Sequence, residues 1–284
     1  MIHLVVDSIS DISPEEAASL GVELLILPVR FDEEEFHEGV DLTRAEFYRR
    51  LRACTDSLPK TSQITPDEYK KTFKRLLQTP GDEVVCITGS SKISGCCQSA
   101  KVARSMLDEP ERVYVVDSLI AISGYALLVR MAAAQRPRCT SGQELADYVK
   151  HLRDHQRTYG QADDLRYLVL GGRLNPAVAK AGTALHIKPM LVFEEGEVRQ
   201  AGLVRGKDRA LNWYADKLRQ YPPRLDIPLW VAGADCPETV QKTVDYLQSL
   251  GLALPPIYTM DVGPVVGTYV GPGLISVSWI ETET

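Results

Sequence analysis

Short apolar runs alternate with helical segments through the first half of the chain. The runs cover residues 2–6, 83–88 and 112–116, and each passes through polar residues into a segment with helix-start signals. Buried strands that alternate with helices are typical of a parallel α/β sheet. Ligands of such a sheet bind beyond the carboxyl ends of its strands. The polar residues that follow these runs are therefore the first candidates for a binding site.

Helix starts in this half are marked by a Ser or Thr followed three residues later by Glu, the pattern of a capping box. The pairs are Ser13 with Glu16, Thr43 with Glu46, and Thr65 with Glu68. Further helices are expected over residues 95–107, 124–134 and 142–159, and a strand over residues 22–29. The acidic run 32–35 is expected to be a solvated loop or turn.

The second half of the chain has a different pattern. Two apolar stretches, residues 187–193 and 198–203, flank a Gly-containing turn and predict a β-hairpin. Strands are also expected over residues 228–232, 256–260 and 271–280, and helices over residues 208–220 and 238–250. A hairpin with interleaved helices indicates a mixed sheet. The sequence therefore predicts two α/β domains, an N-terminal one with a parallel sheet over residues 1–160 and a C-terminal one with a mixed sheet over residues 161–284.

Composition narrows the classes of function. The 284 residues include 32 Lys and Arg against 38 Asp and Glu, and this net charge of −6 disfavours nucleic acid, which requires a basic face. No apolar run approaches the roughly 20 residues of a membrane span, and the N-terminus does not resemble a signal peptide. We expect a cytoplasmic protein with six reduced cysteines and no integral membrane association. We identify no C-x-x-C or His-x-x-x-His ligand set and therefore expect no metal site.

Two polar segments are candidates for binding an anion. Ser94 and Gly95 stand between a predicted strand and a predicted helix, where hydroxyls and free backbone N–H groups attract a phosphate or a carboxylate. Thr61 and Ser62 precede another capped helix and could supply two more donors. Each segment also has a structural interpretation, because Ser is a favoured helix cap and residues 60–63 have the composition of an ordinary loop.

Three further features bear on the chemistry. Arg173, after two glycines, could lend a cation to the anion or could be a surface residue of a turn. Residues 263–273 hold four Gly and two Pro with no charged side chain, a density that lets backbone approach a ligand closely. Cys96 and Cys97 begin a predicted helix, a position that lowers the pKa of a thiol, but a Cys nucleophile also needs a positioned base. Two buried small residues are the alternative interpretation, since Cys is among the most buried residue types.

These motifs, in this order, resemble the DegV family of bacterial fatty-acid-binding proteins, which have an EDD-type fold. The resemblance covers essentially the whole chain and rests on the order and spacing of the motifs more than on any one of them. They include Val6-Asp7-Ser8, Asp41-Leu42-Thr43, Thr61-Ser62-Gln63, Ser94-Gly95-Cys96-Cys97-Gln98-Ser99-Ala100, Val116-Asp117-Ser118, Gly171-Gly172-Arg173, Ile187-Lys188-Pro189, Arg205-Gly206-Lys207 and Gly263-Pro264-Val265-Val266-Gly267-Thr268.

The resemblance implies two α/β domains with a lipid tunnel between them that holds one long-chain fatty acid. It also implies that the hydroxyls of Thr61 and Ser94 bind the carboxylate, assisted by Ser62 and the N–H of Gly95. Tyr269 stands where the family commonly has a His that hydrogen-bonds the carboxylate. A Tyr hydroxyl can also donate a hydrogen bond, although it carries no charge at neutral pH.

The resemblance further implies a carrier that uses no cofactor and is not itself an enzyme. Family members present the fatty acid to a separate fatty acid kinase, a step in phospholipid metabolism, and Arg173 and Arg205 fall where the family has basic residues near the site mouth and the kinase contact. Two alternatives stay open. One is a hydrolase or transferase that depends on Cys96 or Cys97, which stand where the family usually has Thr-Tyr. The other is a binder of a phosphorylated metabolite at the same anion site.

Overall fold

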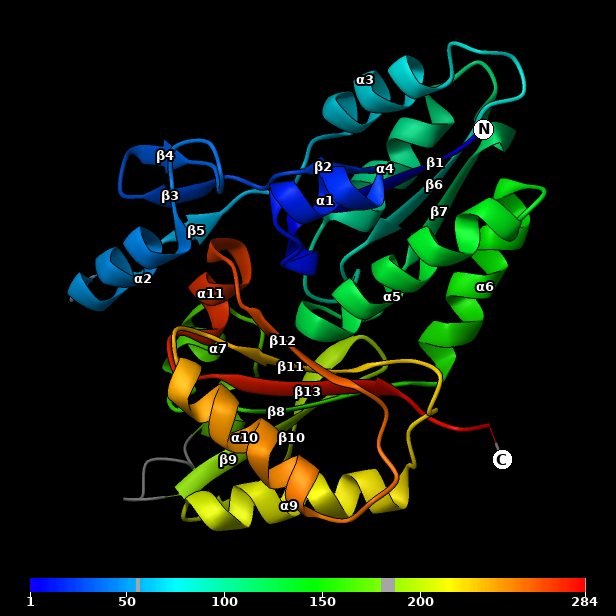
Figure 1. Ribbon diagram of the computed structural model, residues 1–284. Coiled ribbons are helices and arrows are strands. Elements are labelled where there is room, and N and C mark those ends of the chain that lie inside the picture. Colours follow the sequence, from blue (N-terminus) through cyan, green and yellow to red (C-terminus); the bar gives the residue numbers. More distant parts are fainter. Residues whose placement is uncertain (55–56, 180–186, 284) are drawn as a thin grey trace.

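The computed structural model describes residues 1–54, 57–179 and 187–283, and it contains two α/β units stacked on one another (Figure 1). The first unit is built on four parallel strands in the order β2-β1-β6-β7. Their bounds are Ile2–Asp7 for β1, Val22–Leu25 for β2, Glu83–Thr88 for β6 and Val113–Asp117 for β7. The prediction of a parallel sheet in the first half is confirmed.

Helices cover both faces of this parallel sheet. On one face α3 (Pro66–Leu76) packs against α4 (Cys96–Ser105), and on the other α5 (Ile122–Gln135) packs against α6 (Gly142–Asp154) (Figure 1). A further helix, α1 (Pro14–Leu20), contacts the strand β2. The predicted caps are confirmed, because Ser13, Thr43 and Thr65 each accept a hydrogen bond from the backbone N–H three residues later.

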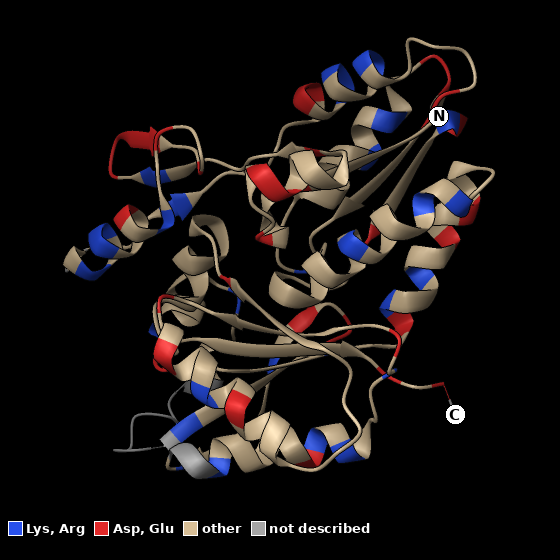
Figure 2. Ribbon diagram, viewed as in Figure 1, with Lys and Arg blue, Asp and Glu red and all other residues tan. Residues whose placement is uncertain are grey.

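A small antiparallel sheet projects from the first unit, with strands in the order β4-β3-β5. Its strands are β3 (Val29–Phe31), β4 (Glu34–Phe36) and β5 (Lys60–Thr61), and α2 (Arg44–Ala53) packs on it through Phe47 and Phe31. The acidic run 32–35 is exposed, as predicted, but only Asp32 and Glu33 form the turn, because Glu34 and Glu35 belong to β4; the run is the red hairpin of Figure 2.

The strand expected over residues 22–29 is in fact divided between these two sheets. β2 ends at Leu25, and β3 begins at Val29. Pro28 has no N–H to give to a sheet, and the N–H of Leu27 donates to the Ser8 hydroxyl at 2.9 Å rather than to a strand. The chain therefore leaves the parallel sheet between the two strands.

The second unit is built on a six-stranded mixed sheet in the order β10-β9-β8-β13-β11-β12. Of its neighbouring pairs, β11 and β12 are parallel and the others are antiparallel, which confirms the predicted mixed sheet and hairpin. The strands are β8 (Gln156–Gln161), β9 (Ile187–Glu194), β10 (Glu197–Arg205), β11 (Leu229–Gly233), β12 (Ile257–Asp261) and β13 (Ile275–Ile280). The helices are α7 (Arg166–Leu170), α8 (Pro176–Ala179), α9 (Lys207–Gln220), α10 (Pro237–Ser249) and α11 (Pro264–Val270).

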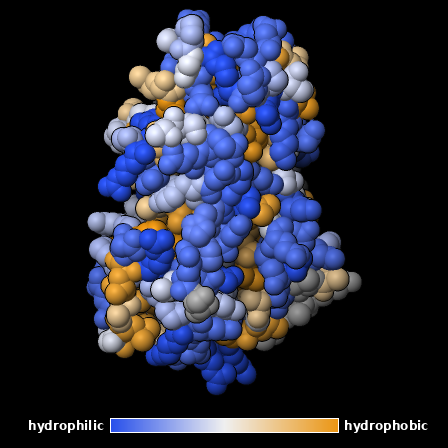
Figure 3. Space-filling model, turned by 90° about the vertical axis from the view of Figure 1, so that its right-hand side faces the viewer, coloured by the Kyte–Doolittle hydropathy of each residue, from blue (hydrophilic) through white to orange (hydrophobic). Residues whose placement is uncertain are grey.

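The helix α5 joins the two units. It contacts η1 (Ser8–Ser10) at the end of β1 on one side, and β8, β11 and β13 on the other. Its apolar residues point in all directions, and Leu127, Leu128 and Val129 are each at most 1% exposed. A helix that is apolar all round is stable only between two layers. The outer face of the second sheet is covered by α9 and α10, and the side of the molecule in Figure 3 is mainly hydrophilic, with small scattered apolar areas.

The helix expected over residues 142–159 is too long. It ends at Asp154, and residues 156–161 form β8, which pairs with β13 and β9. The partner strand β13 lies more than 110 residues later in the sequence, so no local pattern announces the pairing. The domain boundary expected at residue 160 falls inside β8.

The Gly- and Pro-rich segment 263–273 contains a helix that the sequence analysis does not predict. Pro264 takes the first position of α11 after Gly263, and the helix ends at Gly271, where φ is +68°. Gly273 also has a positive φ, so the last strand begins at Ile275 and not at residue 271 as expected. The helix is almost entirely buried, which explains its apolar composition.

Candidate functional site

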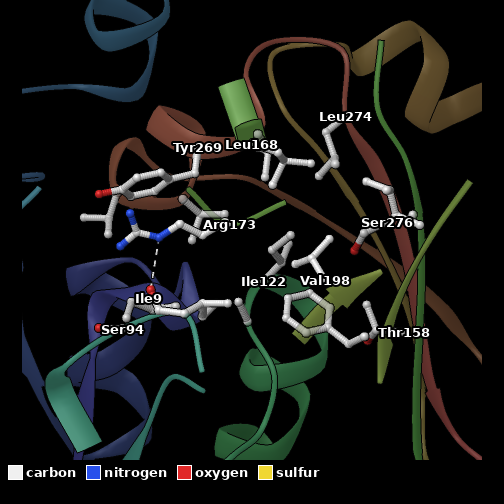
Figure 4. A pocket seen from close by; sticks show the side chains of 18 of the residues that line it. Ile9, Ser94, Ile122, Thr158, Leu168, Arg173, Val198, Tyr269, Leu274 and Ser276 are labelled. Carbon is white, nitrogen blue, oxygen red and sulfur yellow. Dashed lines mark hydrogen bonds between the residues drawn. The ribbon is translucent and has the colours of Figure 1, made fainter. Parts of the chain in front are cut away.

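A largely apolar cavity lies between the two units. Its walls come from η1, the loop after β2, the β9–β10 hairpin and α11, through Ile9, Leu27, Leu191, Val198, Val265 and Val266 among others. The empty space is about 760 Å³, counting the part that is open to solvent. Polar side chains line two separate parts of it: Ser94, Arg173 and Tyr269 on one side, and Thr158 and Ser276 on the opposite side (Figure 4). Thr61 belongs to the first group, since its hydroxyl bonds that of Tyr269.

The first polar group is held together by direct contacts. Thr61, at the end of β5, and Tyr269, on α11, share a hydrogen bond of 2.8 Å between their hydroxyl oxygens. The guanidinium of Arg173, in the turn after α7, lies 3.9 Å from the centre of the Tyr269 ring. Three elements that are far apart in the sequence therefore meet at one point on the cavity wall.

Arg173 supplies the charge of this polar end. Its Nε donates to the Ile93 carbonyl at 3.1 Å, and another guanidinium nitrogen donates to the carbonyl of Gly171. Of the described residues that line the cavity, Arg173 alone is charged, and it has no carboxylate partner in the described part of the chain. Arg173 also lines an outer groove beside the hairpin, so it stands between the cavity and the surface. A carboxylate in the cavity would meet a cation that no carboxylate of the described residues neutralises.

Ser94 and Gly95 stand at the start of α4. The Ser94 hydroxyl lines the cavity and accepts a hydrogen bond from the N–H of Cys96 at 3.3 Å, which leaves its own proton free to donate. Gly95 is the N-cap residue of α4, and the Gln63 side chain occupies the position that a Cβ on residue 95 would need. Ser94 is therefore not the N-cap of α4, as the structural interpretation expected; its hydroxyl bonds the first N–H of the helix and lines the cavity, while its role in ligand binding stays a prediction.

Two of the expected site residues lie away from this group. Ser62 is exposed, and its N–H donates to the Pro28 carbonyl at 3.4 Å. Arg205 is exposed at the end of β10. Neither lines the cavity, so the residues that the structure brings together are Thr61, Ser94, Arg173 and Tyr269, with Gly95 beside them.

The aspartates at the ends of β1 and β7 position the loops around the site. The Asp7 carboxylate accepts hydrogen bonds from the N–H groups of Ile9 at 3.1 Å and Gly89 at 2.9 Å, while Asp117 accepts one from Ser91 at 3.1 Å. Complete burial raises the pKa of Asp7 to about 7. The Asp-Ser pairs that mark the strand ends in the sequence thus shape the loop that carries Ser94.

Cys96 and Cys97 are fully buried, as the structural interpretation of this pair predicts. Burial raises the pKa of Cys96 to about 12 and also raises that of Cys97, so the start of α4 does not produce a thiolate at neutral pH. This disfavours a nucleophilic role for either thiol, because the thiolate is the reactive form.

Two cavity residues are absent from the sequence-based candidates. Thr158 on β8 and Ser276 on β13 are buried hydroxyls that line the side of the cavity opposite to Thr61. Thr158 is not a candidate in the sequence because it falls within the helix expected over residues 142–159, whereas it lies on the strand β8. Ser276 lies in a strand that was predicted, but only the alternation of the strand could have suggested that its side chain faces inward.

A surface cluster also escaped the motif analysis. Contrary to the expectation that no such set is present, His151 on α6 and His155 just after its end have the His-x-x-x-His spacing, and together with Glu283 their ligand atoms all lie within 4.8 Å of one another. The His151 Nε2 and a Glu283 carboxylate oxygen are 2.7 Å apart. The cluster lies on α6 and the C-terminal segment, and none of its residues lines the cavity.

Comparison with known proteins identifies the family. The family model described as "Uncharacterised protein, DegV family" matches residues 1–282. A DegV domain-containing protein of Halalkalibacterium halodurans is 33% identical over 281 residues, which cover 98% of each chain. Another, from Deinococcus radiodurans, is 32% identical over 290 residues, which cover 98% of this chain and 97% of the relative.

Solved structures agree with these relatives. The fatty-acid-binding DegV family protein of Thermus thermophilus is 26% identical and superimposes with a TM-score of 0.89 over 99% of each chain. DegV, a fatty acid binding protein from Bacillus subtilis, is 27% identical, with a TM-score of 0.84 over 99% of each chain. Within the described residues, no helix is long and apolar enough to cross a membrane. The chain belongs to the DegV family.

Proposed function

We propose that this protein binds one long-chain fatty acid in the cavity between its two units and presents it to a fatty acid kinase. The observation that carries the proposal is the polarity of the cavity, whose apolar walls end at a group of hydroxyls beside Arg173, which pairs with no carboxylate among the described residues. The fatty acid binding of the Thermus thermophilus and Bacillus subtilis relatives supports the same ligand class.

The carboxylate is assigned to the end formed by Thr61, Ser94 and Tyr269. Thr61 and Tyr269 share one hydrogen bond, so one of their two hydroxyl protons is free to donate to a ligand, and the Ser94 proton is free as well. Arg173 supplies a positive charge at this point. These local donors are needed because the net charge of −6 gives the molecule a field that repels anions.

The acyl chain provides most of the favourable free energy. At about 0.8 kcal/mol for each buried CH₂, a C16 chain gains about 12 kcal/mol before the costs of association are subtracted. Those costs amount to roughly 4–15 kcal/mol. A phosphorylated metabolite lacks this apolar contribution and would require more than one cation around its dianion. The cavity composition therefore favours a lipid.

The binding proposal is tested by the lipid that the protein retains. We expect solvent extraction of protein purified from cells, followed by mass spectrometry, to yield about one fatty acid per chain. The double variant Thr61→Ala, Ser94→Ala should bind palmitate more weakly, and the exposed Thr259→Ala change on β12 serves as its control. Protein that carries no fatty acid and takes none up would refute the proposal. Unchanged affinity in the double variant would refute the assignment of the carboxylate end.

The carrier role has a separate test. The loaded protein, incubated with a bacterial fatty acid kinase and ATP, should yield acyl-phosphate. Arg205 is exposed at the end of β10, so Arg205→Ala should slow this reaction without changing the fatty acid affinity. Arg199→Ala on the same strand, where the guanidinium already pairs with Glu194, is the matched control. Failure of the kinase of the same organism to use the loaded protein would refute the carrier role and leave the binding role standing.

A further inference from the structure

The side of the cavity opposite to the proposed carboxylate end is also polar. Thr158 and Ser276 line it, although they are only 4% and 1% exposed (Figure 4). They stand on the adjacent strands β8 and β13, where Thr158 pairs with Ser278 and Gly160 pairs with Ser276. A cavity that held only an alkyl tail would gain nothing from hydroxyls at this position.

These two hydroxyls are the ends of a row of four. Ser123, on α5, lies 2.6 Å from the hydroxyl oxygen of Ser276 and 2.7 Å from that of Ser278. Ser278 in turn lies 2.6 Å from the hydroxyl of Thr158. The row therefore runs Ser276, Ser123, Ser278, Thr158, and the side-chain amide of Gln156 bonds the hydroxyl of Thr158 at its end.

Counting protons shows that the row leaves one hydrogen-bonding capacity unused. Four hydroxyls carry four protons, and the three bonds between them use three. With the Gln156 amide donating to Thr158, one proton has no acceptor among the described residues. A spare proton on Ser123 or Ser278, in the middle of the row, would be buried without a partner, so it is favoured at an end of the row, on Ser276 or Thr158, which face the cavity.

The opposite orientation of the Gln156 amide also leaves a hydroxyl at the cavity with an unused hydrogen-bonding capacity. Its carbonyl oxygen would then accept the proton of Thr158, and every hydroxyl in the row would donate to the next. Ser276 would be left with an oxygen that accepts nothing. In both orientations a hydroxyl that lines the cavity keeps either a proton or an accepting position that no described residue uses, and a ligand group that both donates and accepts hydrogen bonds fits either case.

We propose that this is a second recognition point for the ligand, and that the protein prefers a fatty acid with a hydroxyl group on the distal part of its chain. The inference rests on the proposed fatty-acid binding and specifies its substrate class. The start of α5 adds to the preference for oxygen, because Ala121 and Ile122 line the cavity and no side chain caps this helix terminus. The four-hydroxyl row also joins α5 to the second sheet, and recognition uses only its two ends.

The test compares stearic acid with its 2-, 10- and 12-hydroxy derivatives on delipidated full-length protein by isothermal titration calorimetry. At least one of the two distal isomers should bind at least about fivefold more tightly than stearic acid, the factor expected for one additional buried hydrogen bond. The 2-hydroxy isomer, with its hydroxyl near the carboxylate, should show no such gain. If stearic acid binds and neither distal isomer binds more tightly, this inference fails; if none of the acids binds, the proposed function fails.

Variants locate the preference in the row. Ser276→Ala and Thr158→Val should reduce the ratio of the stearic acid Kd to the distal-hydroxy acid Kd towards one. Thr61→Ala should weaken both acids by the same factor and leave that ratio unchanged. An unchanged ratio in both Ser276→Ala and Thr158→Val would overturn the inference. The ratio in the unaltered protein decides the question even if a variant does not fold.

Discussion

Removing the hydroxyl of Tyr269 tests the proposed carboxylate end at a single atom. In Tyr269→Phe the ring that stacks on Arg173 stays, while the hydrogen bond of 2.8 Å to Thr61 and the donor to a bound carboxylate are lost. A hydrogen bond to a charged group contributes about 1.5–3 kcal/mol, and the neutral bond to Thr61 about 0.5–1.5 kcal/mol. Because the bond to Thr61 is lost from the free and the bound protein alike, the net loss of binding free energy should be that of the charged bond, about 1.5–3 kcal/mol, or about 10- to 150-fold in Kd.

The measurement is the Kd of palmitate for delipidated protein, obtained by isothermal titration calorimetry. Tyr258→Phe is the matched control, since Tyr258 is 49% exposed on β12 and does not line the cavity. A fatty alcohol of the same length should lose less affinity in Tyr269→Phe than palmitate does, because it presents a neutral acceptor. Equal or tighter palmitate binding by Tyr269→Phe would refute the placement of the carboxylate beside Thr61 and Tyr269.

Three further predictions concern burial and backbone geometry. Burial raises the pKa of Asp7 from 3.8 to about 7, so between these values the folded protein holds a proton that the unfolded chain releases. The contribution of Asp7 to the free energy of unfolding is therefore lost as the pH rises from about 4 to 7. Relative to wild type, the urea unfolding free energy of Asp7→Asn should therefore rise by up to about 4 kcal/mol across this window, and a pH-independent difference would contradict the assignment. Iodoacetamide should label Cys96 slowly in the native protein and rapidly in urea, because burial raises the pKa of its thiol to about 12. Peptide mass mapping measures the labelling, and fast labelling of the native protein would support Cys96 as a nucleophile. Gly271→Ala should destabilise the protein by at least about 1–3 kcal/mol, since φ is +68° and a Cβ would overlap the Tyr167 ring. Gly172→Ala is the control and should cost less, because φ is also positive there but the space is open. Equal losses in thermal unfolding would show that the overlap is relieved.

Elements with local signals were predictable. The strands β1, β6 and β7 are runs of consecutive apolar residues, and the caps Ser13 and Thr65 lie three residues from the groups they bond. The predictions failed where the deciding partner is remote. Residues 156–159 of β8 fall within the expected helix, because the pairing of β8 with β13 involves residues more than 110 positions away. The helix α11 was missed because Gly and Pro usually interrupt helices, whereas here burial of its apolar residues stabilises it.

The residues of the candidate site follow from local patterns, whereas the contacts between them do not. The sequence alone proposes Thr61, Ser94, Tyr269 and Arg173 as candidates, because strand ends, helix starts and family motifs are patterns of neighbouring residues, and all four line the cavity. The bond between Thr61 and Tyr269 spans 208 positions, and it could be seen only in the folded chain.

The sequence by itself determined the α/β class, the parallel first half, the helix caps and the order of the family motifs. All of these follow from periodicity and hydrogen bonds over a few residues. The tertiary structure decided the rest: that α5 lies between two sheets, that the cavity has polar groups on two sides, and that Ser276 and Thr158 face it. These features depend on which distant surfaces pack together, and packing is a property of the whole chain that no short stretch of residues encodes.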